Sequence, residues 1–202
     1  MSNSLKRYSI RQATKQDLPA ITEIYNERIA NSTGLFIYEA VSVDYMKKWL
    51  DDSQKMGYPA IVAVEKTTGH TVAYSYLGSF RSKPAFNLSA EITVYIHLDH
   101  HRQGLGRLLS LEMIRIGTEM KFKAITAGIT TENTPSIGLF KSLGFNEAGV
   151  FHNTGYKFGR FLDVTFLEYC IPETEGPGDG KIPRFIPFPW DKYVFGQSLY
   201  NK

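Results

Sequence analysis

The chain has 202 residues, a formal net charge of +3, 43% hydrophobic and 21% charged residues, which is the composition of an ordinary globular protein with one sizeable core. A charge this mild does not indicate nucleic acid as a partner. No run of about 18 apolar residues occurs, so we expect no membrane span. The single cysteine, Cys170, allows no intramolecular disulfide, and no apolar signal core follows the first basic residues. These features predict a cytoplasmic protein.

Expected strands and helices mix irregularly along the first 171 residues. Apolar residues at alternating or helical spacing predict strands at 8–11, 60–64, 71–77, 91–96, 124–129, 145–150 and 164–171. Helices are expected to begin near residues 14–17, 41, 106 and 133. Because strict strand–helix–strand alternation is missing, the pattern favours a mixed α/β or α+β sheet over a doubly wound parallel one.

The composition changes after residue 171. Residues 172–180 are rich in Pro, Gly and acidic side chains and are typical of a linker. A disordered tail is poor in aromatic residues, so we expect the tail to pack on the domain or on a partner subunit, with a loose tail as the alternative. We therefore divide the chain into a domain at 1–171 and a linker and tail at 172–202. The aromatic residues of the tail are Phe185, Phe188, Trp190, Tyr193, Phe195 and Tyr200.

A short loop at 101–106, His-Arg-Gln-Gly-Leu-Gly, separates the expected strand at 91–96 from the next helix. Glycines two residues apart at a helix start let backbone N–H groups approach an anion, and the helix N-terminus adds partial positive charge. Arg102 and Arg107 add cations, so a phosphate or pyrophosphate site is predicted, with a simple tight turn as the alternative. The loop lacks the third glycine of a dinucleotide fingerprint and the Gly-Lys-Ser/Thr of a nucleotide P-loop, which excludes both common nucleotide sites.

Two motifs carry a resemblance to a known family. The segment 91–109 resembles the acetyl-CoA signature of the GCN5-related N-acetyltransferase superfamily, Arg/Gln-x-x-Gly-x-Gly/Ala after a strand, with Gly104 and Gly106 in place and His101 at the first position. The segment 133–145 resembles the superfamily's Asn-x-x-Ser/Ala…Leu-Gly-Phe element. Over about residues 8–171 the chain is similar to phosphinothricin acetyltransferase-like proteins, on the stretches 24–27, 32–36, 80–86, 91–96 and 155–164.

The resemblance implies an α/β (α+β) GCN5-related fold, with a mixed, mostly antiparallel sheet and helices on both faces. Strand 91–96 would part from strand 124–129 and free backbone groups for the pantetheine arm of acetyl-CoA, while residues 102–107 would hold its pyrophosphate. At His101 we expect a weakened phosphate contact. The implied cofactor-binding residues are Val94, Tyr95, Ile96, Arg102, Gln103, Gly104, Leu105, Gly106, Arg107, Asn133 and Ser136.

The chemistry of acetyl transfer needs a neutral amine, because an amine attacks a thioester only without its extra proton. Glu91 matches the family's general base, and the alternative is a solvated strand-end glutamate. A backbone N–H such as that of Ile96 would stabilise the oxyanion. Phe140 stands where many members carry a tyrosine that protonates the leaving thiolate. We therefore expect the thiolate to leave unprotonated or to take its proton from water. Tyr156 is not favoured as the proton donor. Phe158 stands where related proteins often have His, which excludes a His-assisted mechanism there.

The acceptor site is implied by the same resemblance. Arg81 and Lys83 match the positive pair that grips the acceptor's carboxylate and its phosphinate- or sulfone-like oxygens, and Phe36 and Phe86 would shape the pocket; a solvated basic loop is the alternative. We expect acetylation of the α-amine of a small amino acid of the phosphinothricin, methionine sulfone or methionine sulfoximine type. One alternative is an acetyltransferase that acts on a protein N-terminus or another amine. The other is a non-catalytic module that binds acetyl-CoA. The family commonly forms homodimers, so a homodimer is expected.

Two remaining groups of residues invite other chemistry. His97, His100 and His101 lie on one loop, but only Asp99 stands nearby as a further ligand, so we predict no metal site. For Cys170 we expect a buried apolar role rather than that of a nucleophile.

Overall fold

The computed structural model describes residues 3–172, 175–176 and 178–200; positions 173, 174 and 177 of the expected linker lie outside them. The helices are α1 (Asn3–Arg7), α2 (Leu18–Asn31), α3 (Val43–Met56), α4 (Leu105–Glu119) and α5 (Thr134–Ser142). The strands are β1 (Tyr8–Gln12), β2 (Ala60–Glu65), β3 (Thr71–Ser79), β4 (Ser89–Ile96), β5 (Ala124–Thr130), β6 (Asn146–Lys157) and β7 (Arg160–Cys170). Short 3-10 turns occupy Lys15–Asp17, Pro84–Phe86 and Leu98–His100.

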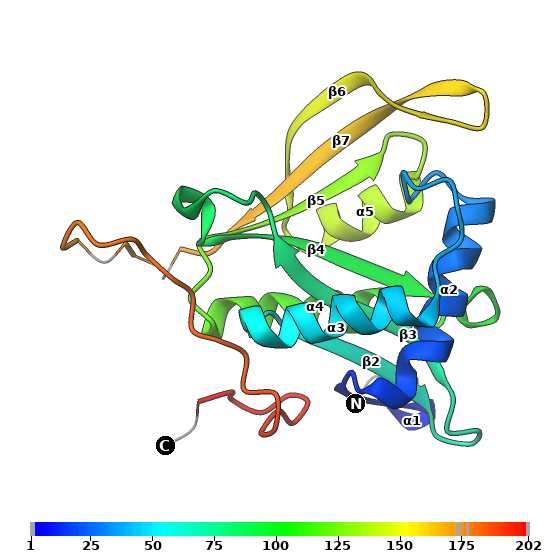
Figure 1. Cartoon of the computed structure of the whole chain (residues 1–202), viewed down its shortest axis with the longest axis horizontal. Coiled ribbons are helices and arrows are strands. Elements are labelled where there is room, and N and C mark those ends of the chain that lie inside the picture. The colour runs from blue at the N-terminus through cyan, green and yellow to red at the C-terminus, as the bar shows by residue number, and fades with distance from the viewer. Residues whose placement is uncertain (1–2, 173–174, 177, 201–202) are drawn as a thin grey trace.

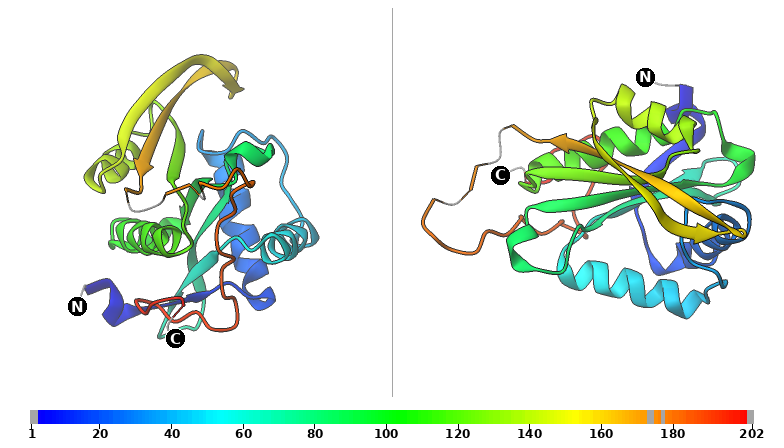
Figure 2. Two further views of the ribbon diagram at one scale, coloured as in Figure 1. Left: turned by 90° about the vertical axis from the view of Figure 1, so that its left-hand side faces the viewer. Right: turned by 90° about the horizontal axis from the view of Figure 1, so that it is seen from above.

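One seven-stranded sheet organises the molecule in the order β1-β2-β3-β4-β5-β7-β6. Every neighbouring pair is antiparallel except β4 and β5, which are parallel. Helices α2 and α3 cover one face, and α4 and α5 cover the other (Figures 1 and 2). The expected mixed, mostly antiparallel sheet with helices on both faces is confirmed.

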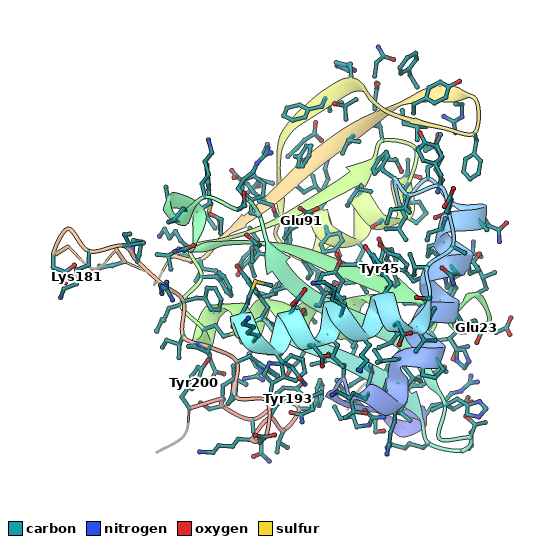
Figure 3. The ribbon with its side chains drawn as sticks, in the orientation of Figure 1. Glu23, Tyr45, Glu91, Lys181, Tyr193 and Tyr200 are labelled. Atoms are coloured by element: carbon teal, nitrogen blue, oxygen red, sulfur yellow. The ribbon has the colours of Figure 1, made fainter. Side chains whose placement is uncertain are left out.

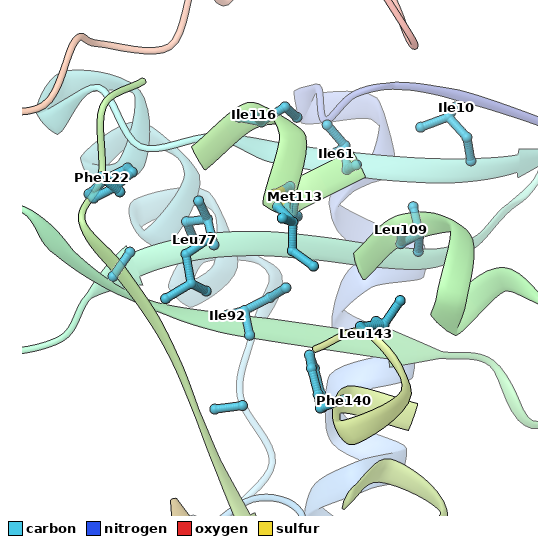
Figure 4. Packing of buried hydrophobic residues seen from close by; sticks show 14 of the residues in the cluster. Ile10, Ile61, Leu77, Ile92, Leu109, Met113, Ile116, Phe122, Phe140 and Leu143 are labelled. Carbon is cyan, nitrogen blue, oxygen red and sulfur yellow. The ribbon is translucent and has the colours of Figure 1, made fainter. Parts of the chain in front are cut away.

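The main core lies between α4 and the sheet. The apolar positions of α4 at helical spacing, Leu109, Met113 and Ile116, are fully buried and face Leu77 of β3 and Ile92 of β4 (Figure 4). Strand β2 is buried along its whole length because it lies between two strands and under helices on both faces. This core fixes α4 against β4, so the loop that joins them is held at both ends.

The β6–β7 hairpin is longer than the sequence suggests. Strands were expected only at 145–150 and 164–171, yet β6 runs to Lys157 and β7 begins at Arg160. The polar, Gly-containing stretch 152–155 hides the strand pattern, and the pairing register shifts there. Phe158 and Gly159 both take positive φ, 54° and 75°, as a two-residue hairpin turn requires.

The described part of the tail runs along the surface of α4 and the nearby loops (Figure 1). Phe185 stacks on Phe122 with ring centroids 4.5 Å apart. The Tyr193 hydroxyl donates to Glu112 Oε1 at 2.9 Å, and the Leu199 N–H donates to Glu119 Oε2 at 2.6 Å. Arg115 is paired with both of these carboxylates, so charged and aromatic contacts fasten the tail to α4.

Among the described residues, no helix is long and apolar enough to cross a bilayer.

Candidate active site

The two parallel strands of the sheet are paired over only three residues. Ser89, Ala90 and Glu91 of β4 lie opposite residues 124–126 of β5, and no pairing follows beyond Glu91. β4 stays paired with β3 up to Ile96, whereas β5 continues alongside β7. The strands therefore diverge from Glu91 onward, as Figure 1 shows, and a V-shaped gap opens in the middle of the sheet, where the sequence led us to expect it.

Main-chain hydrogen bonds decide which residues of β4 face this gap. Leu88 O accepts from the N–H of Lys123, next to β5, at 2.7 Å, and the N–H of His97 donates to Val72 O of β3 at 2.8 Å. Successive residues of a strand direct their backbone N–H and C=O groups to opposite sides. The N–H and C=O groups of Val94 and Ile96 therefore point toward β5, and those of Tyr95 point toward β3. The Tyr95 backbone is thus used within the sheet, and Val94 and Ile96 remain the candidates for cofactor contact.

The glycine loop, residues 101–106, ends at the N-terminus of α4. Gly104 caps the helix with φ of 80°, a conformation that costs a residue with a Cβ about 1–2 kcal/mol. A Cβ on Gly106 would lie 3.1 Å from Leu139 Cδ2 of α5, so a small residue is needed for the close approach of the helices. The first N–H groups of α4, from Leu105 to Arg107, have no intrahelical acceptor and form an anion-binding end.

Gln103 is directed away from any ligand above this helix end. Its Oε1 accepts from Arg7 Nη1 at 2.7 Å and from the Tyr8 hydroxyl at 2.5 Å, and its Nε2 donates to Asp99 O at 3.3 Å. The side chain therefore ties the glycine loop to α1 and β1. The main-chain carbonyl of Gln103 also accepts from Ser4 Oγ at 2.7 Å, so only its N–H remains for a cofactor, and the motif alone does not show this.

His101 also has a use other than the expected phosphate contact. Its Nε2 lies 3.1 Å from Ile96 O at the open end of β4 and 3.5 Å from Arg28 Nη2 of α2. The neighbouring His100 Nδ1 is 2.8 Å from the Tyr8 hydroxyl, and burial lowers the pKa of His100. Within the described residues, no group of three or more His, Cys, Asp or Glu side chains is arranged to hold a metal ion.

The remaining cofactor residues lie around the same gap. The Asn133 side chain caps α5 by accepting from the Ser136 N–H at 3.3 Å, so these two predicted residues contact each other. Arg107 Nη1 donates to Ser142 Oγ at 3.1 Å, and Arg102 is exposed with φ of 59°. The start of α4 therefore packs against the second half of α5, where a Cβ on Gly106 would lie 3.1 Å from Leu139 Cδ2.

Glu91 lies where β4 and β5 begin to diverge (Figure 3). Its Oε1 is 3.5 Å from the point where a Cβ on Gly128 of β5 would stand, so the carboxylate lies against β5 at van der Waals distance. Burial raises the pKa of Glu91, and the positive charge of Arg81 acts in the opposite direction. A carboxylate with a raised pKa at the edge of a gap is suited to accept a proton near neutral pH.

The predicted acceptor residues come from two separate segments. Arg81, Lys83 and Phe86 are exposed on the β3–β4 connection, where Phe86 packs edge-on against Phe80 with centroids 5.9 Å apart. Phe36 lies on the α2–α3 loop, residues 32–42, and its ring lies against Gly155 of β6. The electrostatic influence of Arg81 on Glu91 joins the first segment to the base.

Sequence reasoning missed a group of tyrosines on the Glu91 face of the sheet. Tyr74 and Tyr76 are two residues apart on β3, so their side chains lie on the same face of the sheet as that of Tyr95 of β4. The rings of Tyr74 and Tyr76 contact each other, Tyr95 contacts Tyr74, and Tyr25 of α2 contacts Tyr95. Burial raises the pKa of Tyr76 and Tyr95, and the charge of Glu91 raises both further. The two-residue spacing of Tyr74 and Tyr76 in the sequence could have indicated that these tyrosines share one face of the sheet.

Cys170 is exposed, so the predicted buried role is wrong. It is the last residue of β7 and pairs with Ala124, the first residue of β5, so it lies at the margin of the sheet.

Comparison with known proteins identifies the family. Residues 10–166 match the acetyltransferase (GNAT) domain. The chain is 36% identical over 169 residues to the L-methionine sulfoximine/L-methionine sulfone acetyltransferase of Salmonella typhimurium, covering 84% of this chain and 98% of that protein. It is 32% identical over 170 residues to the phosphinothricin N-acetyltransferase of Streptomyces viridochromogenes, covering 83% and 90%.

Solved structures agree with this result. YncA of Salmonella typhimurium with its cofactor acetyl-CoA superposes with a TM-score of 0.82 at 35% identity, covering 86% of this chain and 99% of that one. The phosphinothricin acetyltransferase of Sinorhizobium meliloti in complex with acetyl-CoA gives 0.82 at 30% identity, covering 88% and 96%. The chain therefore belongs to the GNAT acetyltransferase family and is an acetyl-CoA-dependent N-acetyltransferase, close to the phosphinothricin and methionine sulfoximine acetyltransferases.

Proposed function

We propose that this enzyme acetylates the α-amine of a small amino-acid-like acceptor of the phosphinothricin, methionine sulfone or methionine sulfoximine type. The observation that carries the proposal is the position of Glu91, whose carboxylate with a raised pKa stands at the point where β4 and β5 diverge. Relatives over 30% identical are named for these acceptors, which supports the choice of substrate class.

The residues around the gap fit acetyl-CoA. Val94 would bond the pantetheine arm through the backbone groups that face β5, and the α4 N-terminus from Gly104 to Arg107 would hold the pyrophosphate. Ile96 contributes only its N–H at the gap, because its carbonyl oxygen lies 3.1 Å from His101 Nε2. Arg102 adds an exposed cation there, and Asn133 and Ser136 would border the arm from α5. When bound, acetyl-CoA supplies a thioester carbonyl as the acyl donor. We infer that no metal takes part.

Proton transfer in this proposal falls to Glu91. Its carboxylate accepts the ammonium proton of the acceptor, directly or through water, and so provides a neutral amine. The Ile96 N–H, which faces the gap, then stabilises the oxyanion. Phe140 is buried and packs edge-on against Phe145, so it supplies no proton to the leaving thiolate, which departs unprotonated or takes a proton from water.

Acceptor recognition is assigned to the two exposed segments beside the gap. Arg81 and Lys83 would bind the acceptor's carboxylate and its second polar end, and Phe36 and Phe86 would contact its side chain. A polyamine acceptor is disfavoured because like charges repel at this loop. A protein N-terminus as the acceptor remains the rival to a small amino acid.

A thiol-release assay decides between them. Acetyl-CoA is offered with free amino acids, methionine sulfone, methionine sulfoximine, phosphinothricin and a short peptide. We expect turnover with the sulfone, the sulfoximine or phosphinothricin. Turnover with the peptide alone contradicts the small-acceptor proposal.

We also propose a cytoplasmic homodimer whose C-terminal tail at 172–202 is appended to a catalytic domain at 1–171. The exposed thiol of Cys170 suits a reducing compartment. The contacts of the tail with α4 support the division of the chain.

The homodimer is supported by the β6–β7 hairpin, which presents Phe151, Tyr156, Phe158 and Phe161, each at least half exposed. An apolar patch of this kind marks an interaction surface. Light scattering coupled to size exclusion would measure the oligomeric state.

A further inference from the structure

A buried lysine joins the β6–β7 hairpin to the α2–α3 loop. Lys157, the last residue of β6, is 3% exposed, and its Nζ donates to the carbonyls of Ile29, Ser32 and Leu35 at 2.7, 2.8 and 2.7 Å. An ammonium has three N–H groups, and all three are used. The carbonyls lie at the C-terminal end of α2 and just after it, where helix carbonyls lack partners and the dipole is negative.

This lysine is stabilised differently from most buried lysines, which are paired with a carboxylate. Among the described residues, the structure records no carboxylate within ion-pair distance of Lys157. Its three acceptors are main-chain atoms of one segment, 29–35. The burial of Lys157 is therefore tied to the path of that segment and not to an ion pair.

Two further contacts join the hairpin to the same loop. A Cβ on Gly155 would stand 2.3 Å from Cε1 of Phe36, so the Phe36 ring is seated directly on the β6 backbone. The Tyr38 hydroxyl donates to Tyr156 O at 2.5 Å. Both views of Figure 2 place the end of the hairpin beside the loop after α2. Residues 155–157 thus fix the position of the Phe36 ring from one side.

The same loop spans the two strands that diverge at Glu91. The Tyr95 hydroxyl of β4 donates to Gly34 O at 3.3 Å. On the other side, Thr33 Oγ1 lies 3.1 Å from the Oγ1 of Thr130, the last residue of β5. The loop therefore bridges the open end of the gap, on the face of the sheet that carries Glu91, Tyr76 and Tyr95.

We propose that Lys157 is a positioning residue for acceptor binding: by gathering the carbonyls of residues 29, 32 and 35, it sets the place of the loop and of Phe36 relative to Glu91. This inference rests on the proposed function of the site. Burial lowers the pKa of Lys157, and the three short hydrogen bonds hold the charged form in place. The acceptor pocket is thus completed by the far hairpin as well as by the strands that carry the base.

The test is a steady-state analysis of Lys157→Met, which keeps the length of the side chain and removes the three donors. KM for the best amino-acid acceptor should rise about tenfold, as expected for the loss of one well-placed contact. The kcat value and the Kd of acetyl-CoA should change by less than about twofold, because neither Glu91 nor the glycine loop is touched. Lys141→Met, at an exposed lysine paired with Glu147, is the matched control and should change none of these values.

Two milder variants keep the inference testable if Lys157→Met fails to fold. Gly155→Ala displaces the Phe36 ring without removing a charge, and Tyr38→Phe removes only the hydroxyl contact to Tyr156 O. Both should raise acceptor KM and leave the Kd of acetyl-CoA unchanged. Rescue is tested with Lys157→Cys in a Cys170→Ser background, alkylated with 2-bromoethylamine in denaturant and refolded, which restores an ammonium at nearly the same reach.

The possible results distinguish the role of Lys157 from the proposed function of the enzyme. Recovery of acceptor KM on aminoethylation supports the positioning role. Folded variants with unchanged KM overturn it, and so does an equal loss of acceptor and acetyl-CoA affinity, which would show a general structural role. Failure of the wild type to acetylate any amino acid overturns the proposed function, and this result is visible before any variant is made.

Discussion

The glycine loop and the α2–α3 loop border the same gap between β4 and β5, but they are held in different ways. The glycine loop, at 101–106, lies between a strand and a helix adjacent in sequence, and its key feature is the local conformation of Gly104. The α2–α3 loop is held by Lys157, Thr130 and Tyr95, each more than 60 residues away in sequence. The glycine loop also has long-range contacts, since Gln103 binds Arg7 and Tyr8, but the conformation proposed to bind the cofactor is set locally, whereas the loop proposed to shape the acceptor pocket depends on distant partners.

The largest expected effect comes from Glu91, at the point where β4 and β5 diverge. Glu91→Gln should lower kcat/KM for the best acceptor by about 10²–10⁴-fold, the usual contribution of a general base, and should leave acetyl-CoA binding intact. Burial raises the pKa of Glu91, so its charge opposes folding increasingly as pH rises above the ordinary carboxyl range. The variant should therefore melt at a higher temperature at pH 7. Turnover equal to that of the wild type would remove Glu91 from the mechanism.

The next effect should fall on the cofactor side alone. Gly104→Ala introduces a Cβ at a φ of 80° and 2.7 Å from Ser4 Oγ, so the Ser4 side chain must move, and the strained φ disturbs the N-terminus of α4. We expect the Kd of acetyl-CoA, measured by calorimetry, to rise about tenfold, with acceptor KM unchanged at saturating cofactor. Gly69→Ala is the matched control, since Gly69 has a φ of 72° but nothing within 4 Å; equal loss of cofactor affinity in both variants would contradict the local explanation.

A smaller, directional effect tests the acceptor side. The proposed mechanism uses the ionised form of Glu91, so kcat/KM should fall as pH drops through the raised pKa of this carboxyl. Arg81 counteracts that rise, and Arg81→Gln should therefore move the acid limb of the pH profile to higher pH. Lys83→Gln should weaken acceptor binding without moving the limb. A limb that stays in place in both variants would show that Arg81 does not influence the base.

The smallest effect on catalysis is expected in the tail. Tyr193→Phe removes the hydrogen bond to Glu112 and should lower the free energy of unfolding by about 1.5–3 kcal/mol, the range for a hydrogen bond to a charged group. The kinetic constants should not change. Urea denaturation measures the loss, and Tyr200→Phe, whose hydroxyl bonds only main-chain carbonyls, should lose less. A lowered kcat in Tyr193→Phe would link the tail to the active site.

The sequence predicted the parts of the molecule that depend on neighbours along the chain. The strand at 91–96, the glycine loop and the cap at Asn133 could be anticipated because each is defined by a few consecutive residues. The orientation of the β4 backbone groups could not, since the bond from His97 to Val72 depends on pairing with β3. That pairing is the reason that Val94 and Ile96 face the gap while Tyr95 does not.

Side chains with long-range partners were the least predictable. Gln103 and His101 sit in the cofactor motif, yet one bonds Arg7 and the other lies at the carbonyl of Ile96. Lys157 looks like an ordinary hairpin residue until the fold brings α2 to it. Such roles emerge only when distant segments are placed together, so a motif can identify the ligand while leaving each side chain's contact open.

The divergence of β4 and β5 has a consequence for handling this enzyme. Val94 and Ile96 present main-chain polar groups toward a gap inside a sheet, which amounts to an internal edge that another extended chain could join. A ligand lying along that edge acts as a substitute strand and blocks such pairing. Protein stored with saturating acetyl-CoA or CoA should therefore resist aggregation better than protein without it, quite apart from any gain in catalytic readiness.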